Sequence, residues 1–159
     1  MNVSIIGTGY VGLVTGACFA EIGNQVICVD NDKEKIATLK KGKMPIYEPH
    51  LEELVKKNVE RGRLFFSTSI EEGVSKSRVI FIAVGTPPRE NGEADLSSVE
   101  KVCSQIAQNM KDYKLVVEKS TVPVQTGQWI KRLFNLHNSH PDFDIASNPE
   151  FLREGSAIH

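Results

Sequence analysis

Three closely spaced glycines near the start of the chain constrain its fold more than any other feature. Residues 7–12 read Gly-Thr-Gly-Tyr-Val-Gly, and they follow a short apolar, β-branched run at residues 3–6 that is typical of a buried strand. From residue 10 to residue 22, apolar or small side chains recur at helical spacing, and a second strand pattern, Gln25–Val29, comes next. Strand, glycine turn, helix and strand in this order predict the opening unit of a parallel α/β sheet.

The alternation of strand and helix patterns continues along the chain. Further strands are expected at residues 64–67, 78–84, 114–117 and 143–146, and helices at 33–40, after Pro49 to about 60, at 98–110 and at 124–136. Such alternation predicts a doubly wound parallel sheet of the Rossmann type, with helices on both faces, in one domain that spans residues 1–159. The irregular stretch 85–96 follows a strand end, where α/β proteins place ligands, although a mobile surface loop is the alternative interpretation.

The composition argues against several classes of function. With 19 basic and 20 acidic residues, the net charge of -1 gives no electrostatic attraction for nucleic acid or an anionic membrane. The sequence has no signal-peptide pattern and no apolar run of roughly 20 residues, which predicts a cytoplasmic protein. The cysteines Cys18, Cys28 and Cys103 lack a Cys or His at metal-ligand spacing, so we expect reduced core residues and no metal site. The four histidines are expected at the surface or in loops.

The glycine turn has the chemistry of a phosphate-binding site. Gly7 permits a tight turn, Gly9 allows a pyrophosphate to approach the backbone, and Gly12 lets the helix pack closely on the sheet. Tyr10 and Val11 begin a helix whose free N–H groups and partial positive charge attract phosphate oxygens. The turn therefore predicts a bound dinucleotide, although FAD and other adenine-containing ligands share this pattern.

An acidic residue at the end of the second strand supports the same interpretation. Asp30 stands eighteen residues after Gly12, close to the distance at which a carboxylate accepts hydrogen bonds from the adenosine ribose. Because a carboxylate repels a 2′-phosphate, Asp30 favours NAD over NADP. Lys35 lies about one helical turn beyond and can reach the ribose or a phosphate, which weakens that preference.

Four segments resemble the UDP-glucose/GDP-mannose dehydrogenase family, and the similarity extends over the whole chain. They are residues 7–13 (GTGYVGL), 84–88 (VGTPP) with 94–97 (ADLS), 118–124 (EKSTVPV) and 147–155 (SNPEFLREG). The last two are the most specific, and they are closer to the UDP-glucose branch of the family than to its GDP-mannose or UDP-mannosamine branches. The resemblance implies an NAD-dependent oxidoreductase that acts on a nucleotide sugar.

The resemblance also implies roles for loops at two further strand ends. Besides the glycine turn with Tyr10 and Val11, the family's NAD contacts match Val84, Gly85, Thr86, Pro87, Ser120 and Thr121. In the family, the residue that matches Thr121 also positions the catalytic water near the nicotinamide. From the residues alone, the first loop can equally be a rigid connection. Ser120 or Thr121 can equally cap the helix that follows, since Pro123 suits a helix start.

The last of the four segments carries two carboxylates. Glu150 and Glu154 are four residues apart, so they share a face if the segment is helical, and apolar neighbours would disfavour the charged form of one of them. Such a carboxyl suits acid–base chemistry, although a solvated acidic helix start is the alternative. By resemblance, Glu150 is the general acid–base residue and Glu154 contacts NAD. The sugar nucleotide, also by resemblance, lies against Glu150, Phe151, Leu152, Arg153 and Glu154.

The reaction of the family needs more than these 159 residues provide. The resemblance implies two oxidations of UDP-glucose at C6 to UDP-glucuronate, each reducing one NAD, by way of a thioester on a cysteine of a second domain. In the family, that cysteine and the UDP-binding domain come after the part that matches residue 159. So does a long helix that makes most of the contacts in the full-length homodimer. This chain alone is therefore expected to be inactive. The alternatives are another nucleotide-sugar dehydrogenase, a 3-hydroxyacid or 6-phosphogluconate dehydrogenase, a non-catalytic nucleotide sensor and an adenine-ligand methyltransferase.

Overall fold

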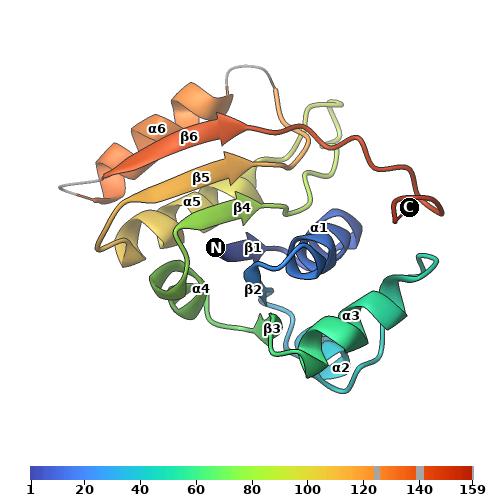
Figure 1. Cartoon of the computed structure of the whole chain (residues 1–159). Helices are drawn as coiled ribbons and strands as arrows, with labels where there is room; N and C mark the ends of the chain where they lie inside the picture. The colour runs from blue at the N-terminus through green and yellow to red at the C-terminus, as the bar shows by residue number, and fades with distance from the viewer. Residues whose placement is uncertain (124–125, 139–141, 159) are drawn as a thin grey trace.

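Six strands lie parallel in one sheet, in the order β3-β2-β1-β4-β5-β6, within the residues that the structure describes (Figure 1). The computed structural model describes residues 1–123, 126–138 and 142–158. The strands are β1 Asn2–Ile6, β2 Gln25–Val29, β3 Leu64–Ser67, β4 Val79–Ile82, β5 Lys114–Glu118 and β6 Phe143–Ser147. β1 pairs with β2 on one side and with β4 on the other, so the direction of winding reverses between β1 and β4. The predicted doubly wound sheet is confirmed, and this reversal is where such sheets bind ligands.

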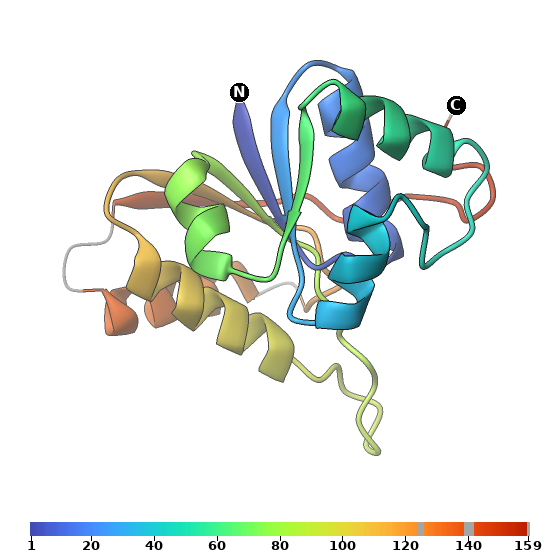
Figure 2. The same ribbon diagram turned by 90° about the horizontal axis from the view of Figure 1, so that it is seen from below.

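Helices cover both faces of the sheet (Figure 2). On one face lie α1 Tyr10–Glu21, α2 Lys33–Lys40 and α3 Leu51–Glu60, and on the other lie α4 Ile70–Lys76, α5 Ser97–Asn109 and α6 Thr126–His137. Successive residues of a strand point to opposite faces, so Ile5 packs in the core with α1, α2 and α3 while Ile6 packs in the core with α4, α5 and α6. Because helices cover both faces, the central strands β1, β2 and β4 are mostly apolar and buried.

Most predicted elements are present, with small differences at their ends. β5 and β6 each extend one residue further than predicted, α5 begins one residue earlier, and β4 is shorter than the predicted strand at 78–84. The helix predicted at 124–136 begins at Thr126 among the described residues, and residues 124 and 125 lie outside them. The stretch 85–96 has no regular element, as predicted, and an isolated antiparallel bridge joins Pro88 to Ala94.

Helix α4 fills the connection between β3 and β4, where the sequence predicts no helix. It is short, and Gly73 in its middle lowers its helix propensity. Gly73 is required because a Cβ there would lie 2.7 Å from Ser4 Oγ on β1. Ser69 caps the helix by accepting a hydrogen bond at Oγ from Glu72 N at 3.1 Å. The cap and the close packing on the sheet stabilise a helix that propensity alone disfavours.

Candidate functional site

The glycine turn lies where β1 meets α1, at the carboxyl edge of the sheet. Gly7 has a φ of +105°, and a Cβ on it would lie 2.4 Å from the carbonyl oxygen of Ala83. A Cβ on Gly12 would lie 1.9 Å from the carbonyl oxygen of Gly7. No atom of the described residues lies within 4 Å of a Cβ built on Gly9. Two glycines therefore allow close packing, and the third borders open space in which a phosphate can approach the backbone.

A crevice of about 370 Å³ opens beside Gly9, between the ends of β1, β2 and β4. Gly9 is the N-cap of α1, and its cap has no side-chain hydrogen bond among the described residues, so N–H groups of the first turn are available to a ligand. The predicted cofactor contacts among its walls are Gly7, Gly9, Asp30, Lys35, Val84 and Gly85. The open glycine, the uncapped helix and the acidic wall together fit a dinucleotide.

The carboxylate of Asp30 is held by polar groups of the crevice wall. Its Oδ2 accepts hydrogen bonds from Thr8 N at 2.9 Å and Thr8 Oγ1 at 2.7 Å, and Lys35 Nζ lies 3.1 Å from the same oxygen. Burial acts to raise the pKa of Asp30, but the hydrogen bonds from Thr8, Asp32 and Lys35 outweigh burial and hold that pKa below its ordinary value. Asp30 is therefore charged at neutral pH. Sequence reasoning missed Thr8, because it occupies a variable position of the glycine pattern.

Helix α5 forms a wall of the crevice that sequence reasoning also missed. Its residues in the wall are Ser98, Lys101, Val102 and Gln105. Their spacing of three and four residues puts them on one helical face, and α5 directly follows the loop at a strand end, which is the signal that identifies them. Lys101 adds a positive charge to the crevice, which suits a ligand with phosphate groups.

Eight predicted cofactor contacts lie outside the walls of this crevice, and Val11 and Pro87 are two of them. Val11 is half-buried and packs against the core on the α1 face of the sheet. Pro87 is exposed, and its carbonyl oxygen accepts a hydrogen bond from Asp95 N at 2.8 Å, which shapes the loop after β4. Both flank the crevice along the chain, so they can contact only the parts of a ligand that extend beyond it.

The loops after β4 and β5 meet at the same edge of the sheet. Thr86 Oγ1 donates a hydrogen bond to the carbonyl oxygen of Thr121 at 2.8 Å, and Thr121 itself is exposed. Ser120 is buried, and its N–H and its hydroxyl both donate to the carbonyl oxygen of Ile82, at 3.1 and 3.3 Å. Residues 121–123 are not helical and α6 is described from Thr126 onward, so neither Ser120 nor Thr121 is directly before the helix as its N-cap. The arrangement leaves Thr121 at the surface of the site and gives the Ser120 hydroxyl a bond to the sheet.

A buried carboxyl group lies directly before the Thr121 loop. Glu118 ends β5 and is 3% exposed. Its Oε1 accepts a hydrogen bond from Ser120 N at 2.7 Å, and Oε2 has no hydrogen-bond partner among the described residues. Burial raises the pKa of Glu118 to about 7. The carboxyl is therefore mostly neutral in mildly acidic solution, a property that the sequence does not reveal.

The segment with Glu150 and Glu154 is not a helix, so the condition under which their four-residue spacing would put them on one face is not met. Pro149 disfavours helical backbone at Asn148, and Gly155 has a left-handed φ of +83°. Glu150 Oε1 instead accepts a hydrogen bond from Leu152 N at 2.7 Å, a local interaction that competes with helix formation. The segment runs irregularly along the edge of the sheet.

This segment passes beside the first helix. Arg153 O accepts a hydrogen bond from Tyr10 Oη at 3.4 Å. Burial, the neighbouring Glu48 and the charge of Glu154 raise the pKa of Tyr10 to about 12, so the phenol is neutral. Leu152 is half-buried against the core on the α1 face, whereas the predicted ligand contact Phe151 is 88% exposed. The fold thus brings the segment to the glycine turn and leaves the side chain of Phe151 open to a ligand.

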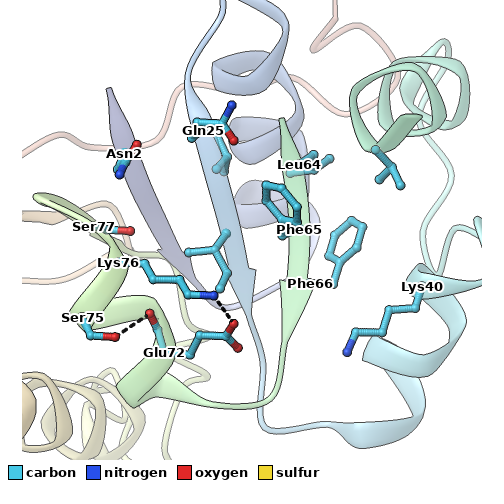
Figure 3. A pocket seen from close by; sticks show the side chains of 13 residues that line it. Asn2, Gln25, Lys40, Leu64, Phe65, Phe66, Glu72, Ser75, Lys76 and Ser77 are labelled. Atoms are coloured by element: carbon cyan, nitrogen blue, oxygen red, sulfur yellow. Dashed lines mark hydrogen bonds and ion pairs between the residues drawn. The ribbon is translucent and has the colours of Figure 1, made fainter. Parts of the chain in front are cut away.

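A larger hollow, of about 750 Å³, lies away from all of these residues (Figure 3). It opens beside Asn2, Gln25 and Leu64, the first residues of β1, β2 and β3, and therefore lies at the amino edge of the sheet. In doubly wound sheets, ligands bind at the carboxyl edge, where helix N-termini converge. We therefore assign the functional site to the smaller crevice.

The three cysteines have free thiols that are wholly or partly buried. Cys28 and Cys103 are buried and Cys18 is half-buried, as the sequence predicts. Burial raises the pKa of Cys28 to about 12 and also raises the pKa of Cys103, so neither is a thiolate at neutral pH. Within the described ranges, no three His, Cys, Asp or Glu side chains gather to hold a metal ion. The helices described are all too short or too polar to cross a membrane.

Comparison with known proteins identifies the family to which a chain with this site belongs. Residues 1–159 match the family model of the UDP-glucose/GDP-mannose dehydrogenase family, NAD binding domain. The chain is 52% identical over 159 residues to the UDP-glucose 6-dehydrogenase TuaD of Bacillus subtilis (strain 168), covering 99% of this chain and 34% of TuaD. The chain therefore spans about a third of the length of that relative.

Two solved structures share the fold closely. A GDP-mannose dehydrogenase from Pseudomonas aeruginosa has a TM-score of 0.95 and 39% identity, covering 99% of this chain and 38% of that one. A UDP-glucose dehydrogenase from Pyrobaculum islandicum has a TM-score of 0.94 and 41% identity, covering 98% of this chain and 37% of that one. Because the family model covers every residue, this chain belongs to the UDP-glucose/GDP-mannose dehydrogenase family and is an NAD-binding domain of it.

Proposed function

We propose that the chain supplies the NAD site and part of the substrate contacts for the oxidation of UDP-glucose to UDP-glucuronate. One observation carries the proposal: the open turn at Gly9, the exposed Thr121 and the segment with Glu154 gather at one edge of the sheet. The similarity to TuaD supports UDP-glucose as the substrate. NAD, when bound, accepts the hydride that leaves C6 of the sugar.

The crevice residues bind and orient the cofactor in this proposal. Backbone N–H groups at the start of α1 hold the pyrophosphate, and the missing Cβ of Gly9 allows its approach. The charged carboxylate of Asp30 accepts hydrogen bonds from the adenosine ribose and repels a 2′-phosphate. Lys35 and Lys101 offer positive charge to the phosphates. Among these groups, Asp30 is the one that distinguishes NAD from NADP.

The exposed residues of the neighbouring loops act on the reacting end of the substrate. The Thr121 hydroxyl holds a water molecule near the nicotinamide, and Glu150 takes and returns protons as that water reacts. Phe151, Leu152 and Arg153 flank the sugar nucleotide, and Glu154 lies against NAD. Supporting this division, the segment is irregular, open to solvent at Phe151 and placed beside the glycine turn by Tyr10.

We further propose that these residues need a second domain for turnover. The buried thiols of Cys28 and Cys103 are poor nucleophiles, and the chain spans about a third of TuaD. The chain with NAD and UDP-glucose is therefore expected to produce no NADH, measured by absorbance. The nucleophilic cysteine, the UDP-binding surface and the homodimer contacts belong, in this proposal, to the remainder of such an enzyme. Turnover by the chain alone would contradict it.

Calorimetric titration with NAD and with NADP tests the cofactor assignment. We expect NAD to bind more tightly than NADP, and we expect Asp30→Ala to weaken NAD binding by about tenfold through loss of charge-assisted hydrogen bonds to the ribose. Glu34→Ala is the matched control, because Glu34 is an exposed carboxylate in the first turn of α2. Tighter binding of NADP, or unchanged binding by Asp30→Ala, would overturn the role of Asp30.

A GDP-mannose substrate is the second candidate, because the Pseudomonas aeruginosa GDP-mannose dehydrogenase has a TM-score of 0.95 to this chain. The two substrates differ in their base and in the sugar. NMR titration of the NAD-bound chain with UDP-glucose and with GDP-mannose separates them at the backbone signals of residues 148–158. We expect UDP-glucose to shift these signals at lower concentration, and the reverse order would favour GDP-mannose.

A further inference from the structure

A buried carboxylate joins two distant parts of the site. Glu48 lies in the connection between α2 and α3, and it is 5% exposed. Its Oε2 accepts a hydrogen bond from Tyr10 Oη at 2.6 Å and another from Gly155 N at 2.7 Å. Its Oε1 accepts one from Ala157 N at 2.8 Å. Gly155 and Ala157 lie 107 and 109 residues further along the chain, so the fold, not the local sequence, brings them to Glu48.

Both side-chain oxygens of Glu48 have to accept hydrogen bonds, because all three of these partners are donors. An ionised carboxylate only accepts hydrogen bonds, so it matches two backbone N–H groups and a phenol hydroxyl. Burial of a charge is costly unless donors surround it. Glutamine has the same shape, but its NH₂ group is a donor and would face one of the existing donors. The pattern of donors therefore selects glutamate.

The backbone of Glu48 is bonded to the start of α3, which packs in the core. Its carbonyl oxygen accepts a hydrogen bond from Leu51 N at 3.2 Å, and Leu51 is 1% exposed at the start of α3. On the opposite side, Ala157 and Ile158 pack against the core on the α1 face. Figure 2 shows the connection between α2 and α3 beside the C-terminal segment. The carboxylate thus links the connection before α3 to a segment without regular structure.

We propose that Glu48 is a positioning residue, which fastens residues 153–157 to Tyr10 and so sets where Glu150 and Glu154 lie relative to the cofactor crevice. The fastening follows from the hydrogen bonds alone. Its consequence for the bound cofactor rests on the proposed function. Glu48 is not among the residues that line the crevice, and it acts on the segment through Tyr10, Gly155 and Ala157.

Amide hydrogen exchange of the 159-residue chain, measured by NMR, tests the fastening. In Glu48→Gln, we expect the amides of Gly155 and Ala157 to exchange about tenfold faster or more, while amides in the strands keep their rates. We also expect the pKa of Tyr10, followed by its ring carbon signal, to fall from about 12, because Glu48 contributes to raising it. Glu53→Gln, at a side chain that is 87% exposed, is the matched control and should change neither.

Addition of NAD separates positioning from simple packing. NAD should shift the amide signals of Glu154 and Gly155 in the parent chain, whereas Glu48→Gln should lose these shifts and keep NAD affinity within about twofold. Unchanged exchange at Gly155 and Ala157 in Glu48→Gln would overturn the fastening. Unchanged NAD-induced shifts in that variant would overturn the positioning role. Failure of the parent to bind NAD would count against the proposed function alone, since the exchange rates are measured without ligand.

A second variant keeps the proposal testable if Glu48→Gln does not fold. Tyr10→Phe removes the phenol hydroxyl and leaves the bonds from Gly155 and Ala157 in place. We expect faster exchange at Gly155, which shares Oε2 of Glu48 with the phenol, and a smaller change at Ala157. Equal rates in Tyr10→Phe and the parent would contradict the role of Tyr10 as the anchor.

Discussion

The glycine turn and the segment 148–158 serve the same edge of the sheet, but they are held there in different ways. In the turn the constraints are steric, because a Cβ on Gly7 would overlap the carbonyl oxygen of Ala83 and a Cβ on Gly12 would overlap that of Gly7. In the segment they are hydrogen bonds, which Glu48 accepts from the N–H groups of Gly155 and Ala157, more than 100 positions further on. The turn is closely packed, whereas Phe151 in the segment is 88% exposed.

The difference matches the two tasks that the edge performs in the proposed function. A cofactor common to many enzymes is held by backbone whose shape the packing dictates. In the proposed function the sugar nucleotide, by contrast, meets a segment whose apolar side chains are only partly buried against the core or, at Phe151, exposed. Segments of this kind open locally at a lower free-energy cost than the strands. In the proposed function, the site thus combines a closely packed glycine turn that binds the cofactor with substrate contacts in a segment that a few long-range hydrogen bonds hold in place.

Substitution in the turn is expected to have the largest effect. In Gly12→Ala, the new Cβ would lie 1.9 Å from a backbone oxygen, so the free energy of unfolding should fall by about 3 kcal/mol or more. Gly9→Ala is the control within the same turn, because nothing described lies within 4 Å of its Cβ. It should keep the parent's stability and lose NAD affinity by about tenfold. Urea unfolding measures the free energy of unfolding, and calorimetry measures NAD affinity. If Gly12→Ala and Gly9→Ala were equally stable, close packing would not be what distinguishes Gly12 from Gly9.

The pH dependence of stability at Glu118 is expected to come next in size. The pKa of Glu118 is about 7 in the folded chain and 4.5 ordinarily, so between these values the folded state binds the additional proton. Parent stability should therefore fall as pH rises from about 4.5 through 7, by up to about 3 kcal/mol. Glu118→Gln mimics the neutral form and should lose this dependence.

Urea unfolding at pH 4.5 and at pH 8 checks this expectation. The variant and the parent should be similar at the lower pH, and the variant should be the more stable at the higher pH. Because Asn148 N donates to the carbonyl oxygen of Glu118 at 2.9 Å, the residue also lies where the sheet meets the irregular segment. A variant less stable than the parent at pH 8 would show that the carboxylate is needed in its charged form.

The sequence predicted what depends on local patterns. The sheet, its helices except α4, and the turn around Gly9 follow from periodicity and from glycines at fixed spacing. Asp30 was found because strand ends in such folds lie a known distance from the turn. Thr8, Lys101 and Glu48 were missed, because their roles arise from contacts between elements far apart in the chain. Whether the segment with Glu150 is helical was left open by the four-residue spacing, and Pro149 disfavours the helix.

The bond between the loops after β4 and β5 is expected to contribute less. Thr86→Val removes the hydroxyl that donates to Thr121 O at 2.8 Å and keeps the side-chain volume. The free energy of unfolding should fall by about 1 kcal/mol, the usual contribution of a hydrogen bond. Thr86→Ser retains the hydroxyl and should recover most of the loss. If Thr86→Val matches the parent in urea unfolding, the two loops are held by other contacts.

The smallest effects are expected in the segment itself, at two adjacent apolar residues. Phe151→Ser should change the free energy of unfolding by less than about 0.5 kcal/mol, because the ring is 88% exposed. Leu152→Ala should cost about 1 kcal/mol, since that side chain is only half-buried on the α1 face. Thermal unfolding of the two variants measures these changes in stability. An effect of Phe151→Ser as large as that of Leu152→Ala would mean that the ring packs against the domain. The segment would then resemble the turn in rigidity, and Phe151 would not be free to meet a ligand.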